Sequence, residues 1–338
     1  MRERQEPSAA PPPGQPARSG RPGRPDRTSV PIRDEVALAL AEFAIGVPRD
    51  PDPALIDAAT RVVVDSLAVA LGAFGHPAAA AARRYAGILP GDGPCALWGT
   101  NRRAGPETAA LVNGVPLRGY DFNDLYMGRG TDGHPSDILP GLIAVAEWRG
   151  ASGADFLDAL AVGYEIILDC CDCLAVDRAG WDYVNLTAIG GTAAIARLIG
   201  LDAERTAHAL GITVTAHAAS VEVESGELDK RGDLTMWKRF NGADANRHSV
   251  YACLLASAGA EGAVRPFTGE NGFLSRVNAN AGGGAELLDR LRAKAGLGRI
   301  REVTFKRWPV GSRGQSAIRA ALAARAQNDD PGKAKAVR

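Results

Sequence analysis

The chain has 338 residues with 39 basic and 39 acidic side chains, and the resulting formal net charge of zero offers no basic surface for nucleic acid. No apolar run approaches the roughly 18 to 20 residues that a membrane span needs, so neither nucleic acid nor a membrane is expected as a partner. The five cysteines are an odd number in a long chain, which is not the pattern of a secreted disulfide framework and indicates the reducing cytoplasm.

Residues 1–32 are rich in proline, arginine and glycine and contain almost no large apolar side chains. Such a segment cannot bury enough surface to offset the entropy that it would lose on ordering, so we predict that it is a disordered tail. It also lacks the apolar stretch of a secretory signal.

Residues 33–263 predict an all-helical domain. Ser152 and Asp202 stand where helix N-terminal caps are expected, while Gly114 and Gly211 stand where helices are expected to end. The apolar spacing predicts helices at residues 36–45, 54–74, 78–89, 106–112, 138–148, 156–174, 187–199, 203–210 and 246–258. Residues 95–100 form a short apolar run that fits either a strand or an extended connector.

Residues 264–338 have a different texture. Loops are followed by a glycine-rich patch at residues 282–284, a short helix near residues 287–297 and a strand-like run at residues 300–305. The fold class predicted from the residues is therefore mainly α, with a large all-helical domain and a smaller α+β piece.

The segment 121–140, DFNDLYMGRGTDGHPSDILP, is a polar, glycine-rich loop between two apolar helical runs. It holds one histidine, His134, among four aspartates: Asp121, Asp124, Asp132 and Asp137. A carboxylate near an imidazole can fix its tautomer and raise its pKa, which suits proton transfer near neutral pH. The alternative is an ordinary polar turn in which Ser136 or Asp137 caps the next helix.

Two short segments place a pair of cations between aromatic residues: MWKRF at residues 236–240 and FKRWP at residues 305–309. Each could be a surface patch or a clamp for anions. Two clamps together with the Asp/His loop would suit a substrate with several carboxylates, because lysine and arginine bind carboxylates by charge-assisted hydrogen bonds.

Two further groups of residues favour structural roles. Cys170, Cys171 and Cys173 lie at one helix end without a second pair of ligands at zinc-site spacing, so buried structural cysteines are favoured over a metal site. The remaining histidines stand singly on helical stretches, where placement in the core or on the surface is expected: His76, His208, His217 and His248.

Taken in order, several motifs resemble the MmgE/PrpD family: AALVNG (109–114), YDFND (120–124), GHPSDILPG (133–141), MWKRFNGADANRHSVYACLLASAG (236–259), GENGF (269–273) and KRWP (306–309). The resemblance covers roughly residues 34 to 325. It implies an all-helical domain that carries a smaller α+β lid, with the active site between them, no metal ion or other cofactor, and a homodimer. Family members usually continue well past this length, so the lid is expected to be incomplete and the chain to be C-terminally shortened.

The resemblance also implies roles for particular residues. Asp121 and His134 match the catalytic pair of the family, and His134 is expected to transfer protons. Lys238, which follows Trp237, and Lys306 match two lysines expected to bind substrate carboxylates, and Asp124 of the same loop motif is expected to contact substrate. Tyr183 stands where the family often has a histidine and can still donate a proton. Two further positions differ from the family pattern: Leu125 stands where members often have a threonine, and Gly311 stands where some have a histidine.

The implied function is that of a metal-independent lyase, a hydro-lyase of the 2-methylcitrate dehydratase type associated with propionate catabolism, which acts on a small polycarboxylate. Dehydration without a metal requires side chains that remove a proton next to a carboxylate and protonate a departing hydroxyl. The alternatives are a decarboxylase or epimerase of the same family, similar to cis-aconitate decarboxylase, or a catalytically inactive shortened member.

Overall fold

The computed structural model of the chain describes residues 30–49, 52–89, 91–224, 228, 232, 234–277 and 282–327. Residues 1–29 of the predicted tail lie outside the described residues. Within the described ranges the chain is mainly helical, and its β-structure is confined to two antiparallel pairs of two-residue strands and two single bridges. The predicted mainly α fold is therefore confirmed. None of the described helices combines the length and apolar character that crossing a membrane requires.

The helices follow one another along the chain with short connections. The α-helices are α1 (Glu35–Gly46), α2 (Pro53–Gly72), α3 (Pro77–Ile88), α4 (Pro106–Leu117), α5 (Leu139–Arg149), α6 (Gly153–Cys173), α7 (Val184–Ile199), α8 (Ala203–Ala216), α9 (Trp237–Ser257), α10 (Phe273–Val277), α11 (Gly283–Ala293) and α12 (Ser312–Ala326). The 3-10 helices are η1 (Pro135–Ile138), η2 (Val176–Ala179), η3 (Val221–Glu224) and η4 (Arg299–Glu302). Strand β1 (Cys95–Ala96) pairs with β2 (Arg103–Ala104), and β3 (Tyr126–Met127) pairs with β4 (Asp132–Gly133).

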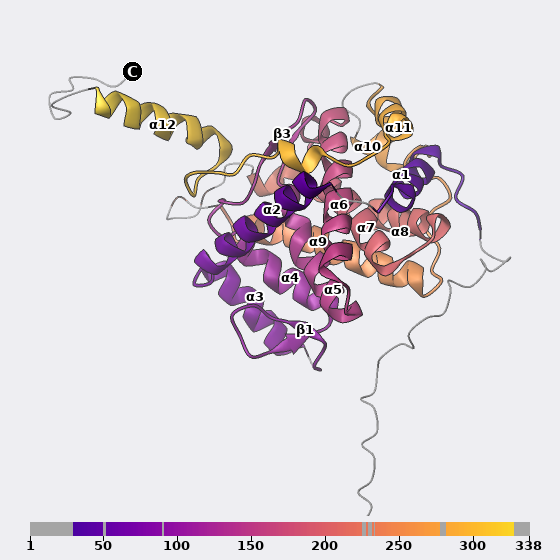
Figure 1. Cartoon of the computed structure of the whole chain (residues 1–338), viewed down its shortest axis with the longest axis horizontal. Coiled ribbons are helices and arrows are strands. Elements are labelled where there is room, and N and C mark those ends of the chain that lie inside the picture. The colour runs from indigo at the N-terminus through magenta and orange to yellow at the C-terminus, as the bar shows by residue number, and fades with distance from the viewer. Residues whose placement is uncertain are drawn as a thin grey trace, which may run out of the picture.

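Helices α6 and α7 form the centre of the bundle, with α2, α3 and α4 to one side and α1 and α8 to the other (Figure 1). Every residue of α6 from Asp158 to Cys173 is buried, and so is every residue of α7 from Val184 to Arg197. A helix buried all round must be surrounded by other elements, which explains why these two have no polar outer face. Helix α12 extends away from the bundle, and none of its residues is buried (Figure 1).

Two glycines that were predicted to end helices lie inside them. Helix α4 continues through Gly114, because a β-carbon there would lie 2.7 Å from the β-carbon of Ala243 on α9, so the glycine permits a close helix crossing. Helix α8 likewise continues past Gly211, where the backbone at Gly262 approaches closely. Both glycines are required by packing between elements and do not end the helix.

Two other boundaries differ from the prediction. Helix α9 begins at Trp237 instead of near Asn246, because its first turns bury polar side chains that interrupt the apolar periodicity. The strand predicted at residues 300–305 is wrong for most of its length, since residues 299–302 form η4 and Thr304 alone pairs, with Leu125. The predicted caps at Ser152 and Asp202 are confirmed: Ser152 Oγ accepts from the Asp155 amide at 3.1 Å, and Asp202 accepts from the Arg205 amide at 2.8 Å.

Asp34 both starts the first helix and holds a distant segment. One of its carboxylate oxygens accepts from the amides of Val36 and Ala37 in the first turn of α1. The other accepts from the amides of Phe267 and Thr268 at 2.8 and 2.7 Å. A fully buried carboxylate needs such a set of donors, and this one connects the beginning of the bundle to residues that follow α9.

The segment that follows is fastened to α6 by ion pairs. Asp169 of α6 accepts from Lys294 at 2.5 Å and from Arg299 at 2.7 Å. Asp172, one turn further on, accepts from Arg299 at 2.9 Å and from Arg290 at 3.0 Å. These contacts place α11 and η4 on the end of α6, while the division into domains near residue 264 remains a prediction.

A buried arginine joins α1, α6 and α7. The Arg197 guanidinium donates to both carboxylate oxygens of Asp158, at 2.6 and 3.1 Å, and to the carbonyls of Ala44 and Val47 at the end of α1. Arg197 is 1% exposed and Asp158 is 4% exposed. Removal of one partner of such a pair leaves a buried charge without compensation.

We therefore expect Asp158→Ala to lower the free energy of unfolding by about 3 to 5 kcal/mol, since Arg197 would keep its charge in the core. The matched control is Asp57→Ala, which breaks an exposed pair with Arg61 one turn along α2 and should change stability by about 0.5 kcal/mol or less. Urea denaturation followed by circular dichroism measures both variants. Equal effects of the two substitutions would contradict the importance of the buried pair.

Candidate active site

A cavity of about 490 Å³ lies where the 121–134 loop, the start of α7, η3, the start of α9 and the start of α12 come together. Four of the six predicted site residues line it: Asp121, His134, Tyr183 and Lys238. The other two, Asp124 and Lys306, lie close to these residues but not on the cavity wall. The fold thus brings the six predicted residues close together from four separate parts of the chain.

The loop rests on the backbone at the end of α6. The Cys171 carbonyl accepts from the amides of Gly130 and Thr131, both at 2.9 Å. A β-carbon at Gly128 or Gly130 would lie 2.5 or 2.8 Å from that same carbonyl oxygen, which is closer than real β-carbons come. The glycines that marked the segment as a loop are therefore needed for its contact with α6.

Asp121 has a strained backbone that Lys306 holds in place. Its φ is +52°, which is the one positive value among the described non-glycine residues. Lys306 Nζ donates to both the carbonyl and the Oδ1 of Asp121, each at 2.7 Å. Burial alone would raise the pKa of Asp121, but the positive charges of Arg118 and Lys306 hold it well below its usual value, so the carboxylate stays ionised.

The hydrogen bonds of His134 fix its tautomer. Nδ1 lies within hydrogen-bond distance of the Asp124 carbonyl, which can only accept, so Nδ1 carries the proton. The lone pair of the neutral ring is then on Nε2, which lies 4.0 Å from Asp121 Oδ1 at the cavity wall. The ring is a proton acceptor in this state.

The expectation of a raised pKa for His134 is wrong, although Asp121 acts in that direction. Burial lowers the pKa well below 6.5, and the positive charges of Arg118 and Lys306 lower it further, while Asp121 only partly opposes them. His134 is therefore neutral at neutral pH.

Asp124 supports the site from behind. Its Oδ1 accepts from the Ser136 amide at 3.1 Å and its Oδ2 accepts from the Tyr164 hydroxyl at 2.9 Å, and the side chain is fully buried. Burial raises the pKa of Asp124 to about 6 in spite of these hydrogen bonds. The side chain of Asp124 thus lies behind the wall, next to the backbone carbonyl that holds His134, and its predicted contact with substrate stays a prediction.

A buried cluster behind the wall was missed in the sequence. Arg118, at the end of α4, is 2% exposed, donates to Asn123 Oδ1 at 3.1 Å and lies 3.8 Å from Asp137 Oδ1. Asp137 accepts from the Tyr183 hydroxyl at 2.8 Å instead of capping α5, which has no side-chain cap. The Tyr183 ring meets His134 edge-on with centroids 5.3 Å apart. The available signal was the lone arginine that ends the apolar run of α4.

Lys238 lies on the cavity wall, whereas Lys306 lies behind it. Lys238 lies in the first turn of α9, lines the cavity and contacts the Glu224 carboxylate, and burial lowers its pKa to about 8. Lys306 lies behind Asp121 with its side chain 1% exposed, and burial also lowers its pKa. Lys306 thus holds Asp121, whereas Lys238 is placed to meet a ligand.

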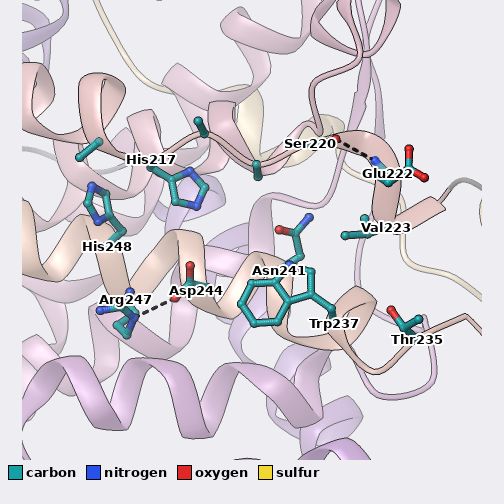
Figure 2. Close-up of a pocket in the computed structure, with 13 residues that line it drawn as sticks. His217, Ser220, Glu222, Val223, Thr235, Trp237, Asn241, Asp244, Arg247 and His248 are labelled. Atoms are coloured by element: carbon teal, nitrogen blue, oxygen red, sulfur yellow. Dashed lines mark hydrogen bonds and ion pairs between the residues drawn. The ribbon is translucent and has the colours of Figure 1, made fainter.

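A second cavity, of about 620 Å³, lies between α9 and the segment that joins α8 to η3 (Figure 2). The rings of His217 and His248, which were expected to stand singly, face each other at one end of it with centroids 5.5 Å apart (Figure 2). Burial lowers the pKa of His217 to about 4, so this ring is neutral. Trp237 lines this cavity and the adjacent Lys238 lines the first, so the start of α9 forms part of both walls.

The cysteines and the other histidines take structural positions. All five cysteines are buried and free, which confirms the prediction for Cys170, Cys171 and Cys173. Within the described ranges, no three His, Cys, Asp or Glu side chains converge as a metal site would require. His208 Nδ1 accepts from the Gly262 amide at 3.1 Å, and His76 caps α3 through the Ala78 amide.

Comparison with known proteins places this geometry in context. The family model for the MmgE/PrpD N-terminal domain matches residues 38–282. The chain is 28% identical to 2-methylcitrate dehydratase of Escherichia coli over 83% of this chain and 58% of that protein. It is 29% identical to the cis-aconitate decarboxylase-like protein oryM of Aspergillus oryzae over 70% and 49%, and 30% identical to the mitochondrial 2-methylcitrate dehydratase of Yarrowia lipolytica over 48% and 32%. The matched regions thus span from one third to less than two thirds of these relatives.

The raised pKa of Asp124 predicts a pH dependence of stability. A carboxyl whose pKa is higher in the folded state than its ordinary 3.8 stabilises the fold at low pH, and this contribution is lost as the pH rises through about 6. Asp124→Asn has no such proton and keeps both hydrogen bonds if the Tyr164 hydroxyl turns to accept.

We expect the unfolding free energy of Asp124→Asn, relative to the unsubstituted protein, to rise by about 2 kcal/mol between pH 4.5 and pH 7.5. Urea titrations at the two pH values measure it, with Asp57→Asn as the exposed control. A difference that stays constant with pH would show that Asp124 is ionised as easily in the fold as outside it.

Proposed function

The chain belongs to the MmgE/PrpD family, and from this premise we propose that it is a metal-independent hydro-lyase of the 2-methylcitrate dehydratase type that acts on a small polycarboxylate. The observation that carries the proposal is the pairing of a neutral His134, with its Nε2 lone pair at the cavity wall, with an ionised Asp121 4.0 Å away. The names of the relatives from Escherichia coli and Yarrowia lipolytica support the reaction class. The metal independence of the reaction is proposed from the family resemblance alone.

In the proposed reaction His134 Nε2 removes the proton from the carbon next to a substrate carboxylate. The electron pair of that C–H bond forms the C=C bond, and the neighbouring C–O bond breaks. The imidazolium that results is stabilised by Asp121, which Lys306 keeps in place. This arrangement gives the catalytic pair one group that accepts the proton and one that stabilises the resulting charge.

The departing hydroxyl needs a proton, and we assign its donation to Tyr183, whose hydroxyl would turn from Asp137 toward the cavity that the residue lines. Burial raises the pKa of Tyr183 well above 10, so the residue keeps its proton at neutral pH. The proton is transferred as the C–O bond breaks, so the hydroxyl leaves as water. Lys238, on the same wall, is placed to hold the carboxylate on which negative charge develops.

A decarboxylase is the second candidate, because the relative from Aspergillus oryzae is named cis-aconitate decarboxylase-like. Decarboxylation releases carbon dioxide and requires no proton for a departing hydroxyl, so it would not depend on Tyr183 in that role. Tyr183→Phe should therefore abolish a dehydratase and leave much of a decarboxylase activity. The homodimer and the cytoplasmic location remain proposals from the family resemblance.

Substitution of His134 tests the proposed base. We expect His134→Ala to lower kcat by about 10²- to 10⁴-fold, the usual contribution of a positioned acid–base group, while substrate binding is retained. Ultraviolet absorbance of the conjugated C=C bond, with 2-methylcitrate, citrate and cis-aconitate in turn, each with and without EDTA, measures turnover. His217→Ala, in the second cavity, is the matched control and should keep its activity. Full activity of His134→Ala, or inhibition of the unsubstituted protein by EDTA, would overturn the proposal.

The second prediction concerns pH. Lys238 has a pKa of about 8 and loses its charge as the pH rises through that value, so kcat/KM should fall on the alkaline side of pH 8. Lys238→Arg keeps its charge throughout this range, because the pKa of arginine exceeds about 12. We expect this variant to lose the alkaline decline. An inactive Lys238→Arg that still binds substrate would instead identify Lys238 as a proton donor.

A further inference from the structure

The first turn of α12 forms one side of the active-site cavity. Residues 311–314 all line it. A β-carbon at Gly311 would lie 3.5 Å from Oδ2 of Asp121, so the backbone here passes directly beside the catalytic carboxylate. The rest of α12 extends away from the bundle (Figure 1), whereas its beginning lines the cavity.

Gln315 fixes this turn relative to Lys306. Its Oε1 accepts from the amides of Arg307 and Trp308 at 3.1 and 3.3 Å. Its Nε2 donates to the carbonyls of Trp308 and Val310 at 2.7 and 3.0 Å. Because Lys306 is bonded to Asp121, the four hydrogen bonds of Gln315 set the position of the α12 turn with respect to the reacting groups.

Arg313 is the cation on this turn, and it differs from the other cations of the site. Lys306 and Arg118 lie behind the wall and are engaged with Asp121 and Asn123, and Lys238 contacts Glu224. Among the described residues, Arg313 lines the cavity and is exposed, and its guanidinium has no hydrogen-bond or ion-pair partner within that part of the chain. It is thus a second cation on the cavity wall, beside Lys238, and it lines the cavity without an ion pair to a described residue.

The surroundings of Arg313 make its charge decisive for an anion. Asp132 and Asp177 line the same cavity. Burial and the charge of Asp177 raise the pKa of Asp132, and the positive charge of Arg313 lowers it, so the three groups act on one another. Without Arg313 this part of the wall would repel a carboxylate.

We propose that Arg313 binds a substrate carboxylate remote from the reacting carbon, and that it thereby makes the cavity selective for tricarboxylates over dicarboxylates. The inference rests on the proposed function, since it names the substrate class of the same site. The planar guanidinium can hold a carboxylate through two parallel hydrogen bonds. The N-terminus of α12, which has no side-chain cap, adds a favourable field for negative charge.

Binding without turnover tests this selectivity. Tricarballylate has three carboxylates and no hydroxyl to eliminate, and glutarate is its two-carboxylate counterpart. Isothermal titration should show that Arg313→Ala weakens tricarballylate binding by about 30-fold or more, as expected when one partner of a charge-assisted contact is truncated. Glutarate binding should change less than about 3-fold, and Arg313→Lys should recover only part of the loss.

Arg319→Ala is the matched control, because this exposed arginine lies on the same helix and does not line the cavity. It should leave both affinities unchanged. Equal weakening of both ligands in Arg313→Ala would overturn the proposal and assign Arg313 to neutralising Asp132 and Asp177. An unchanged affinity for tricarballylate would overturn it as well.

Steady-state kinetics separate this inference from the proposed function. For a turning-over substrate, Arg313→Ala should raise KM and change kcat less than about 3-fold. If the protein binds tricarballylate through Arg313 but dehydrates nothing, the hydro-lyase proposal fails and the carboxylate site stands. If it dehydrates 2-methylcitrate with no dependence of KM on Arg313, the carboxylate site alone fails. If it neither binds tricarballylate nor turns over, both fail.

Discussion

The bonds from Lys306 to Asp121 are the constraint on which the site depends. One buried ammonium group donates to the carbonyl and the carboxylate of a residue 185 positions earlier, and it holds that residue in a left-handed backbone conformation. A buried lysine is stable only with such partners, so the two segments must come together or both lose their hydrogen bonds. A β-bridge between Leu125 and Thr304 joins the same two segments and aligns them in the same way. The loop that contains Asp121 and His134 is therefore held by Thr304 and Lys306, which follow α11 in the chain.

The positive charges of Arg118 and Lys306 also set the ionisation states of Asp121 and His134. Arg118 and Lys306 lie close to both Asp121 and His134, and their field stabilises the anion and disfavours a second cation. The pKa values of both residues are thereby lowered, which leaves a carboxylate that stays charged beside an imidazole that stays neutral. Two groups whose ionisation states are set so differently by their environment can serve as a stabilising anion and a base. Asp124 and Tyr164 contribute by fixing the carbonyl that selects the tautomer.

Local signals made much of the fold and part of the site predictable from the sequence. Caps at Ser152 and Asp202 act within one helical turn, so their side chains identify the helix starts directly. The helix ends predicted at Gly114 and Gly211 were wrong, because the sequence alone does not distinguish a glycine needed for close packing from one needed for a turn. Asp121 and His134 stood out in a short polar loop. The partners of Arg118, the facing rings of His217 and His248 and the position of Lys306 behind the wall depend on contacts between distant segments, which spacing along the chain does not encode.

The contact between the loop and α6 has a consequence for how this site tolerates change. Gly128 and Gly130 press on the carbonyl oxygen of Cys171, which every residue type at position 171 would supply. The constraint from the carbonyl thus falls on Gly128 and Gly130, whereas the side chain at position 171 is limited by Gly133, where a β-carbon would lie 2.9 Å from the Cys171 sulfur. Exchange of the side chain at position 171, near the end of α6, leaves this carbonyl contact in place. A side chain at either glycine would meet that carbonyl oxygen and displace the loop that carries His134.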